Sequence, residues 1–337
     1  MRPTIPNAFR RRLRAAVPLA AAALALAGCD GVSPGLQSDC PPGDDCNGPA
    51  TPVPVVRPTA VTAQVGTSVT ISALAPNVSA TGLTWQWYRS SDGGAHYAAI
   101  PGATGADLTL ASVSLADDGA TLQVTASESG LSGSAASRLA VTASAGVVFT
   151  DGEFQAADWV AAPVGDGGAA ALTSTEELVA TGGHPGAWRR MVFQLAPQAT
   201  SGSVGYTSQV ASYAPQAQGA VYVIDYSEDG LSLETSSTRS ARSALLLDQA
   251  GRRYMATPAD SYARLGMAWD VGQDTSSLRA GDFTLLDGPA CLAGESCPDF
   301  TAAGAPMRFG YWRTVSGPAG ATISHGIDNW KVTVWPR

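Results

Sequence analysis

Apolar and polar residues alternate with a period of two along much of the chain beyond residue 57. Clear runs cover residues 68–74, 107–110 and 120–125, and turn pairs such as Asp92-Gly93 separate them. Successive side chains of a strand point to opposite faces of its sheet, so this alternation predicts half-buried strands. No segment of useful length repeats its apolar residues at the helical spacing. The pattern predicts an all-β fold built of sandwiches.

The N-terminal segment departs from this alternation. Five arginines among the first fourteen residues precede an almost wholly apolar run from Ala15 to Ala27. This run of about 13 residues is too short to cross a hydrocarbon core of about 30 Å. A positive start, a short apolar run and small residues at its end are the parts of a secretory signal. We therefore predict that residues 1–28 are a signal peptide.

The signal ends in Leu26-Ala27-Gly28-Cys29, which resembles the lipobox of bacterial lipoproteins. The resemblance implies cleavage before Cys29, lipidation of Cys29, and export of the protein to the bacterial cell envelope. The membrane would be its partner, and several acyl chains would anchor the protein there more firmly than one. The alternative is an ordinary signal peptide with an incidental cysteine. The inner and the outer membrane both stay open as the destination.

Removal of the signal changes the charge balance of the chain. The full sequence has 20 basic and 28 acidic residues, and the signal holds five of the basic ones. The mature chain keeps 15 basic against 28 acidic residues, a net charge of −13. A general nucleic-acid binder would carry a basic patch or stripe, so we expect no nucleic-acid partner.

The cysteines other than Cys29 form two pairs of equal spacing. Five residues separate Cys40 from Cys46, and five separate Cys291 from Cys297. In an oxidising compartment this spacing favours two local disulfides. The alternative is metal binding, but this spacing is unusual for zinc and no histidine lies near either pair in the sequence.

Composition divides the mature chain into three parts. Residues 29–56 are rich in proline and glycine and have no periodicity, which is typical of a tether. Residues 57–143 contain about seven short alternating runs, which predict a β-sandwich. Residues 146–337 contain longer runs and predict a larger sandwich, including a hairpin that turns at Ala250-Gly251.

The segment 57–143 resembles a bacterial immunoglobulin-like domain. The residues that carry this resemblance are Gly66, Val69 and Ile71, Trp87-Tyr88-Arg89, Ile100 to Thr104, and Asp117 to Ala120. Ala73 and Val124 occupy the places where the antibody pattern has cysteines. The resemblance therefore implies a core held by packing alone, with Trp87 lying over these two residues.

The segment 146–337 resembles the concanavalin A-like lectin/glucanase (laminin-G-like) sandwiches of bacterial surface proteins. The residues that carry this resemblance are Phe149, Asp151-Gly152, Phe154 and Trp159, Gly182 to Gly186 with Trp188-Arg189, Asp299 to Gly304, Phe309 to Tyr311, and Gly326 to Trp330. The resemblance implies a jelly roll that binds carbohydrate or protein, or a hydrolase built on one.

The sequence contains no recognisable catalytic motif. A glucanase of this architecture would place alternate carboxylates on one strand, whereas Glu176 and Glu177 are adjacent and would face opposite ways. The three histidines are dispersed, and there is no nucleophile elbow. We therefore expect a protein that is not an enzyme.

Sugar binding would need exposed aromatic rings on which a pyranose could stack. The first candidate is Trp188, with His184 and Arg189 beside it in a loop rich in glycine and proline. Tyr206, Tyr213 and Trp312 come next. For each ring the alternative is a place in the core.

A structural calcium ion is the one cofactor that the sequence leaves open. Jelly rolls often join their first and last strands through calcium. Asp151 and Asp328 are candidates by position, since they lie near the start and the end of segment 146–337. The alternative is that Asp151 begins a turn and Asp328 accepts hydrogen bonds from the backbone.

These features predict a non-enzymatic, surface-displayed lipoprotein. The first sandwich would serve as a spacer, and the second would bind carbohydrate or another surface protein. The alternatives are a polysaccharide-active hydrolase or lyase, and a structural envelope protein without a small ligand.

Overall fold

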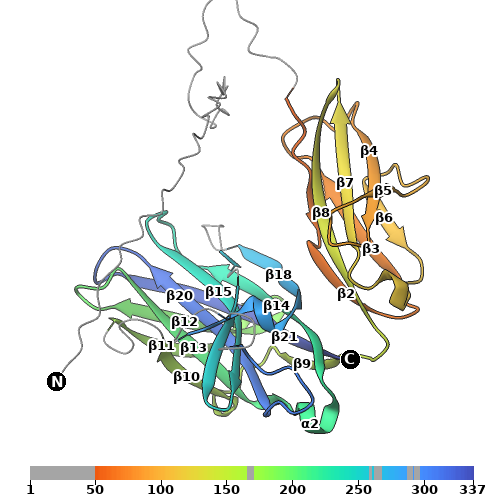
Figure 1. Ribbon diagram of the computed structural model, residues 1–337. Coiled ribbons are helices and arrows are strands. Elements are labelled where there is room, and N and C mark those ends of the chain that lie inside the picture. Colours follow the sequence, from red (N-terminus) through yellow and green to blue (C-terminus); the bar gives the residue numbers. More distant parts are fainter. Residues whose placement is uncertain (1–49, 165–170, 258–259, 262–267, 287–290, 292–296) are drawn as a thin grey trace, which may run out of the picture. The chain divides into compact units, whose positions relative to one another are not determined.

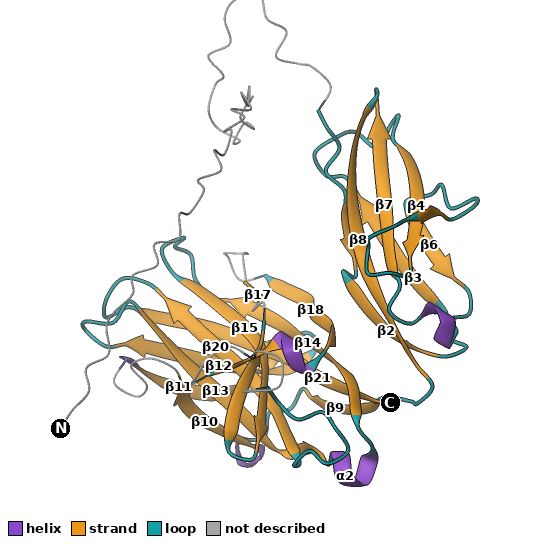
Figure 2. Cartoon of the chain, in the orientation of Figure 1, coloured by secondary structure: helices purple, strands orange, loops and turns teal. Residues whose placement is uncertain are grey.

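The computed structural model describes residues 50–337 except 165–170, 258–259, 262–267, 287–290 and 292–296 (Figure 1). Strands dominate this part, and the longest helix that it describes, α2 (Pro215–Gln218), has four residues (Figure 2). The prediction of an all-β sandwich fold is confirmed. The predicted signal peptide, Cys29 and the tether with Cys40 and Cys46 lie outside the described residues. In the described part, no helix has the length and apolar character to span a bilayer.

Residues 55–142 form two sheets. One has the order β1-β3-β6, and the other has the order β2-β8-β7-β4-β5. The bounds are β1 (Val55–Arg57), β2 (Ala60–Gln64), β3 (Val69–Leu74), β4 (Thr84–Ser90), β5 (Ala98–Ala99), β6 (Asp107–Leu110), β7 (Thr121–Glu128) and β8 (Leu131–Thr142). Only β2 and β8 pair in parallel among these ladders.

Trp87 occupies the core of this first sandwich, as the immunoglobulin-like resemblance implies. It lies opposite Val124 in the β4–β7 ladder, and both side chains are fully buried. The indole Nε1 donates a hydrogen bond of 3.0 Å to the carbonyl of Gly105, which satisfies its only polar atom. Ala73 belongs to the same core, and Trp85 packs against it. Packing therefore replaces the inter-sheet disulfide of the antibody pattern.

Residues 147–336 form two further sheets, which we call the six-stranded and the seven-stranded sheet. The six-stranded sheet has the order β11-β12-β21-β14-β18, with β9 paired to β21. Its strands are β9 (Val147–Asp151), β11 (Leu172–Gly183), β12 (Gly186–Leu195), β14 (Val221–Ser232), β18 (Trp269–Leu278) and β21 (Thr322–Pro336).

The seven-stranded sheet has the order β10-β13-β20-β15-β16-β19, with β17 paired to β15. Its strands are β10 (Trp159–Val164), β13 (Ser201–Tyr213), β15 (Ser240–Gln249), β16 (Arg252–Ala256), β17 (Asp260–Ser261), β19 (Phe283–Leu285) and β20 (Met307–Ser316). The predicted hairpin joins β15 to β16. Ala250 and Gly251 both have positive φ, 54° and 76°, as a two-residue turn of the primed type requires.

The core of this second sandwich comes from the inward positions of both sheets. Met191, Phe193 and Leu195 alternate along β12 and belong to one buried cluster with Phe309 and Tyr311 of β20. No strand of 55–142 pairs with a strand of 147–336 in the described part. The domain boundaries at 57–143 and 146–337 stay a prediction.

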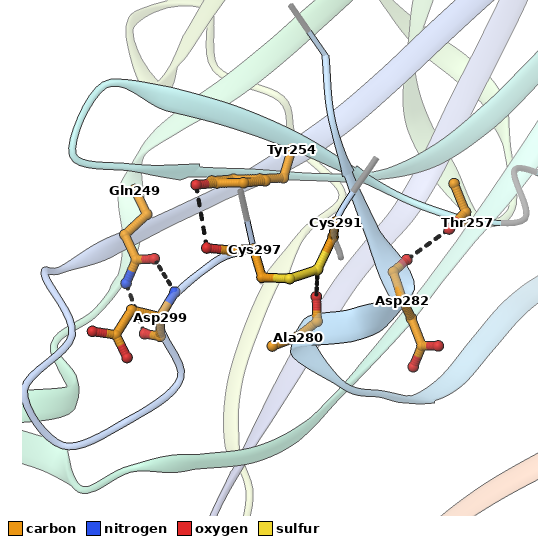
Figure 3. The surroundings of a disulfide bond; sticks show 8 residues. All are labelled: Gln249, Tyr254, Thr257, Ala280, Asp282, Cys291, Cys297 and Asp299. Atoms are coloured by element: carbon orange, nitrogen blue, oxygen red, sulfur yellow. Dashed lines mark hydrogen bonds between the residues drawn. A yellow bond between two sulfur atoms is a disulfide. The ribbon is translucent and has the colours of Figure 1, made fainter. Parts of the chain in front are cut away.

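The second predicted disulfide is confirmed, because Cys291 and Cys297 are bonded with Cα atoms 4.7 Å apart (Figure 3). The residues that follow are fixed to the end of β15 by the Gln249 side chain. Its Nε2 donates to the carbonyl of Asp299 at 2.9 Å, and its Oε1 accepts from the amide of Asp299 at 2.6 Å. The disulfide closes a local loop, and the Gln249 bonds hold Asp299 at the end of β15.

Candidate ligand-binding face

Three of the predicted sugar-stacking rings are buried. Tyr206 and Tyr213 have no exposed surface and Trp312 is 7% exposed, so none of them presents a ring face to solvent. Tyr206 stacks on Tyr311 with ring centroids 4.7 Å apart, and Tyr213 donates to the carbonyl of Gly219 at 2.9 Å. These three predictions are corrected. The irregularity of β13 between Thr207 and Ser212 lets both tyrosines, which are seven positions apart, face the core.

Arg189 is also wrong as a ligand residue, because it lies on the inward side of β12 and is 6% exposed. Its guanidinium lies 5.2 Å from the ring centroid of Tyr206 and 6.0 Å from that of Trp159. Arg190 faces outward and pairs with Glu177 at 3.2 Å. Strand alternation could have identified this residue, since Trp188 and Arg190 must share a face.

Trp188 lies on the outer face of the six-stranded sheet. Its ring meets Trp269 of β18 edge to face, with centroids 5.6 Å apart at 89°. Both indole N–H groups donate to backbone carbonyls at the end of β11: Trp188 to Thr181 at 3.1 Å and Trp269 to Gly182 at 3.0 Å. Trp188 itself is 7% exposed, so Trp269 supplies the more accessible ring of the pair.

A hollow of about 390 Å³ lies against Trp188, whose other neighbour Trp269 is not among the described lining residues. Its lining residues come from β11, β12, β21 and the segment after β14, and are Glu177, Val179, Trp188, Arg190, Leu233 and Ser324. The hollow therefore combines an indole wall, two aliphatic side chains, a hydroxyl and an exposed ion pair. The contributions of Trp269, Glu177, Leu233 and Ser324 were missed from the sequence, because β-strands distant along the chain bring them together.

His184 belongs to a polar cluster at the turn between β11 and β12. Asp229 and Asp328 lie directly opposite each other on β14 and β21. The His184 ring contacts Asp229 at 3.0 Å, and the His184 backbone amide donates to Asp328 at 2.6 Å. Asn329 donates its side-chain amide to Asp229 at 2.7 Å. Half of the His184 side chain is exposed, whereas both carboxylates are buried.

Burial disfavours the charged form of the Asp328 carboxyl. Its pKa is raised above the ordinary value, chiefly by desolvation and also by the charge of Asp229. Hydrogen bonds from the amides of His184 and Asn329 oppose this shift. The cluster fixes the β11–β12 turn against β14 and β21, because both acids are used by the turn.

The two aspartates proposed for calcium are occupied by protein donors. Asp151 accepts from the amides of Glu153 (2.8 Å) and Phe154 (2.7 Å) and from the Trp159 indole (2.7 Å). Asp328 accepts the backbone bonds described above. Within the described ranges, no group of three or more His, Cys, Asp or Glu side chains could hold a metal ion. These oxygens serve the fold, and the residues present do not fit a calcium site.

Comparison with known proteins provides no family. No family model matches the chain, and no curated protein matches it. Among solved structures, a marsupial T cell receptor is 13% identical, with 47% of this chain and 92% of that chain covered and a TM-score of 0.22. A chimeric titin Z1Z2 carrying an exogenous decorin peptide is 14% identical, with 47% and 90% covered and a TM-score of 0.20.

The infectious bursal disease virus VP2 subviral particle covers more of the chain but is less similar in sequence. It is 8% identical, with 79% of this chain and 55% of that chain covered and a TM-score of 0.22. At these TM-scores the likenesses carry no argument about function.

Proposed function

We propose that this protein is an exported lipoprotein of a bacterial cell envelope that binds carbohydrate without cleaving it. The binding module is the C-terminal sandwich, a concanavalin A-like jelly roll, and the immunoglobulin-like sandwich is its spacer. The observation that supports binding is a hollow lined by Trp188 together with Arg190, Glu177 and Ser324, in which Trp269 supports the Trp188 ring edge to face. Anchoring rests on the lipobox-like sequence that ends at Cys29.

The chemistry of this hollow suits a sugar ring. Carbohydrates present an apolar ring face and a rim of hydroxyl groups. Indole and aliphatic side chains match the face, while charged and hydroxyl groups match the rim. The exposed Arg190–Glu177 pair offers both donors and acceptors near the indole wall.

The nearby acids favour binding over cleavage. A glycosidase needs two carboxyl groups that reach the scissile bond. Asp229 and Asp328 are 5% and 1% exposed, and the β11–β12 turn hydrogen-bonds to both. Glu176 points inward and accepts the hydroxyl of Tyr206, so it is turned away from Glu177 and the hollow.

A glycan array with the full-length protein, followed by calorimetry on any binder, tests the proposal. Trp269→Ala and Arg190→Ala should each weaken binding by about tenfold, a loss of about 1.4 kcal/mol. Val210→Ala is the matched control, since this valine is 68% exposed and lies outside the hollow. Absence of any glycan ligand would instead favour a structural envelope protein, and turnover of a bound polysaccharide would contradict the non-enzymatic role.

A further inference from the structure

The second sandwich has an open strand edge at β9. This strand pairs with β21 over Val147–Asp151, and no other described strand pairs with it. Edge strands carry unpaired backbone N–H and C=O groups along their free side. The neighbouring part of β13 does not cover them, because its ladder with β10 ends at Ser208 and its ladder with β20 is interrupted between Thr207 and Ser212.

Of the two unpaired stretches, only β9 keeps its amide groups available. In β13 the Ser208 hydroxyl accepts from the amides of Val210 (3.3 Å) and Ala211 (3.1 Å). Among the described residues, no side chain accepts a hydrogen bond from a backbone amide of β9. Any added strand would therefore pair with β9.

A hollow of about 410 Å³ runs along this edge. It is lined by residues 148–151 of β9 and by Ser208, Val210 and Ala211 of β13. Val148 and Val210 line it from the two strands and are unusually exposed for large apolar side chains, at 53% and 68%. Apolar side chains of a bound segment would cover these valines.

The remaining lining residues make this edge acidic. Asp151, Glu153 and Asp158 line the hollow, and no basic side chain of the described residues does. Asp151 is used by the turn that follows β9. The carboxylates of Glu153 and Asp158 have neither a hydrogen bond nor an ion pair with any residue that the structure describes. Their charge is available to a cationic partner.

We propose that this edge binds an extended, lysine- or arginine-bearing segment of a partner protein, which adds to β9 as a further strand. Strand addition would satisfy the free backbone groups of β9. Alternate side chains would face Val148 and Val210, while cationic ones would reach Glu153 and Asp158. A second copy of this chain is excluded as the partner by charge, since the chain carries a net charge of −8 and both copies would present the same acids. The inference is independent of the glycan-binding proposal.

The test uses the full-length protein and a synthetic heptapeptide of alternating valine and lysine, at low salt. We expect the peptide to bind and to shift the amide resonances of residues 147–151. Two control peptides separate the contributions. One replaces lysine by glutamate and tests charge, and the other is N-methylated at every backbone amide and tests strand pairing. Both should fail to bind.

Variants of the protein locate the site. Glu153→Gln combined with Asp158→Asn should weaken the valine–lysine peptide by about tenfold and flatten the salt dependence. Val210→Lys should abolish binding while leaving the fold intact, because position 210 is exposed. Trp269→Ala should bind the peptide like the parent protein, which separates this site from the glycan face. The proposal is overturned if the valine–lysine peptide does not bind, or if the N-methylated peptide binds equally well.

Discussion

Individual buried residues determine which parts of the second sandwich tolerate change. Arg313 is fully buried, and its Nη2 lies 2.9 Å from each carboxylate oxygen of Glu228, which is 1% exposed. Tyr226 donates its hydroxyl to the same carboxylate, and the guanidinium lies 4.8 Å from the Tyr311 ring centroid. Burial of two charged groups costs free energy, which their mutual attraction offsets. Removal of either partner therefore leaves the other charge buried without compensation.

Arg313→Met should therefore lower the free energy of unfolding by about 3–5 kcal/mol, because it leaves the Glu228 charge buried and uncompensated. Urea unfolding measures this loss. The double variant Arg313→Met/Glu228→Leu removes both charges and should recover part of the stability. If the double variant is less stable than the single one, the loss comes from packing and not from the unpaired charge.

His325 should make the stability of the fold depend on pH. Burial, and then the charge of Arg313, hold the pKa of this imidazole well below its ordinary value. A depressed pKa in the folded state means that the unfolded chain takes up the proton first as the pH falls. The stabilisation is fully present above about pH 6.5 and is lost at up to about 1.4 kcal/mol per pH unit below it.

Urea unfolding between pH 8 and pH 5 tests this linkage. His325→Leu should lose the part of the slope that begins near pH 6.5. Val210→Ala is the comparison, since this side chain does not titrate and is 68% exposed, and its replacement should keep the slope. An unchanged slope in His325→Leu would rule out His325 as the group responsible.

At the scale of elements, strand β12 separates the core from the candidate ligand face. Met191, Phe193 and Leu195 point into the core, while Trp188 and Arg190 point out. Trp188 can lie flat on the sheet only because β21 has a glycine beneath it. A Cβ on Gly326 would lie 2.6 Å from the indole ring.

Gly326→Ala should displace Trp188, lower stability by about 1–3 kcal/mol and weaken glycan binding. Thermal unfolding and tryptophan fluorescence report the two structural effects. Gly281→Ala is the matched control, because a Cβ there meets no atom within 4 Å and its φ is not positive. If the two substitutions changed stability and fluorescence equally, Gly326 would not be the residue that makes room for the Trp188 ring.

At the scale of the whole molecule, lipid attachment would determine where both proposed binding surfaces are displayed. Cys29→Ala should move the protein from the membrane fraction to the soluble fraction and abolish labelling by a fatty-acid probe. Cys40→Ser is the matched control and should stay membrane-bound and labelled. Retention of the label in Cys29→Ala would contradict the lipoprotein proposal.

Much of the architecture could be predicted from local sequence. Period-two alternation predicted the all-β fold, the residue pair Ala250-Gly251 predicted the β15–β16 hairpin, and the short spacing of Cys291 and Cys297 predicted their disulfide. These features depend on neighbours along the chain. The backbone conformation of a turn and the closure of a short loop need no information from distant residues.

The candidate site was predicted less well, because strand alternation does not say which face of a strand is buried. The sequence indicated that Arg189 and Arg190 face opposite ways, but not which of them faces the core. Either tyrosine of β13 could likewise have faced inward, and both do so only because the strand is irregular between Thr207 and Ser212. Only the packing of one sheet on the other decides this, since exchanging the two faces of a strand preserves its alternation. The sequence by itself thus determined strands, turns and close cysteine pairs, while the tertiary structure alone decided which side chains lie near Trp188 and which are buried in the core.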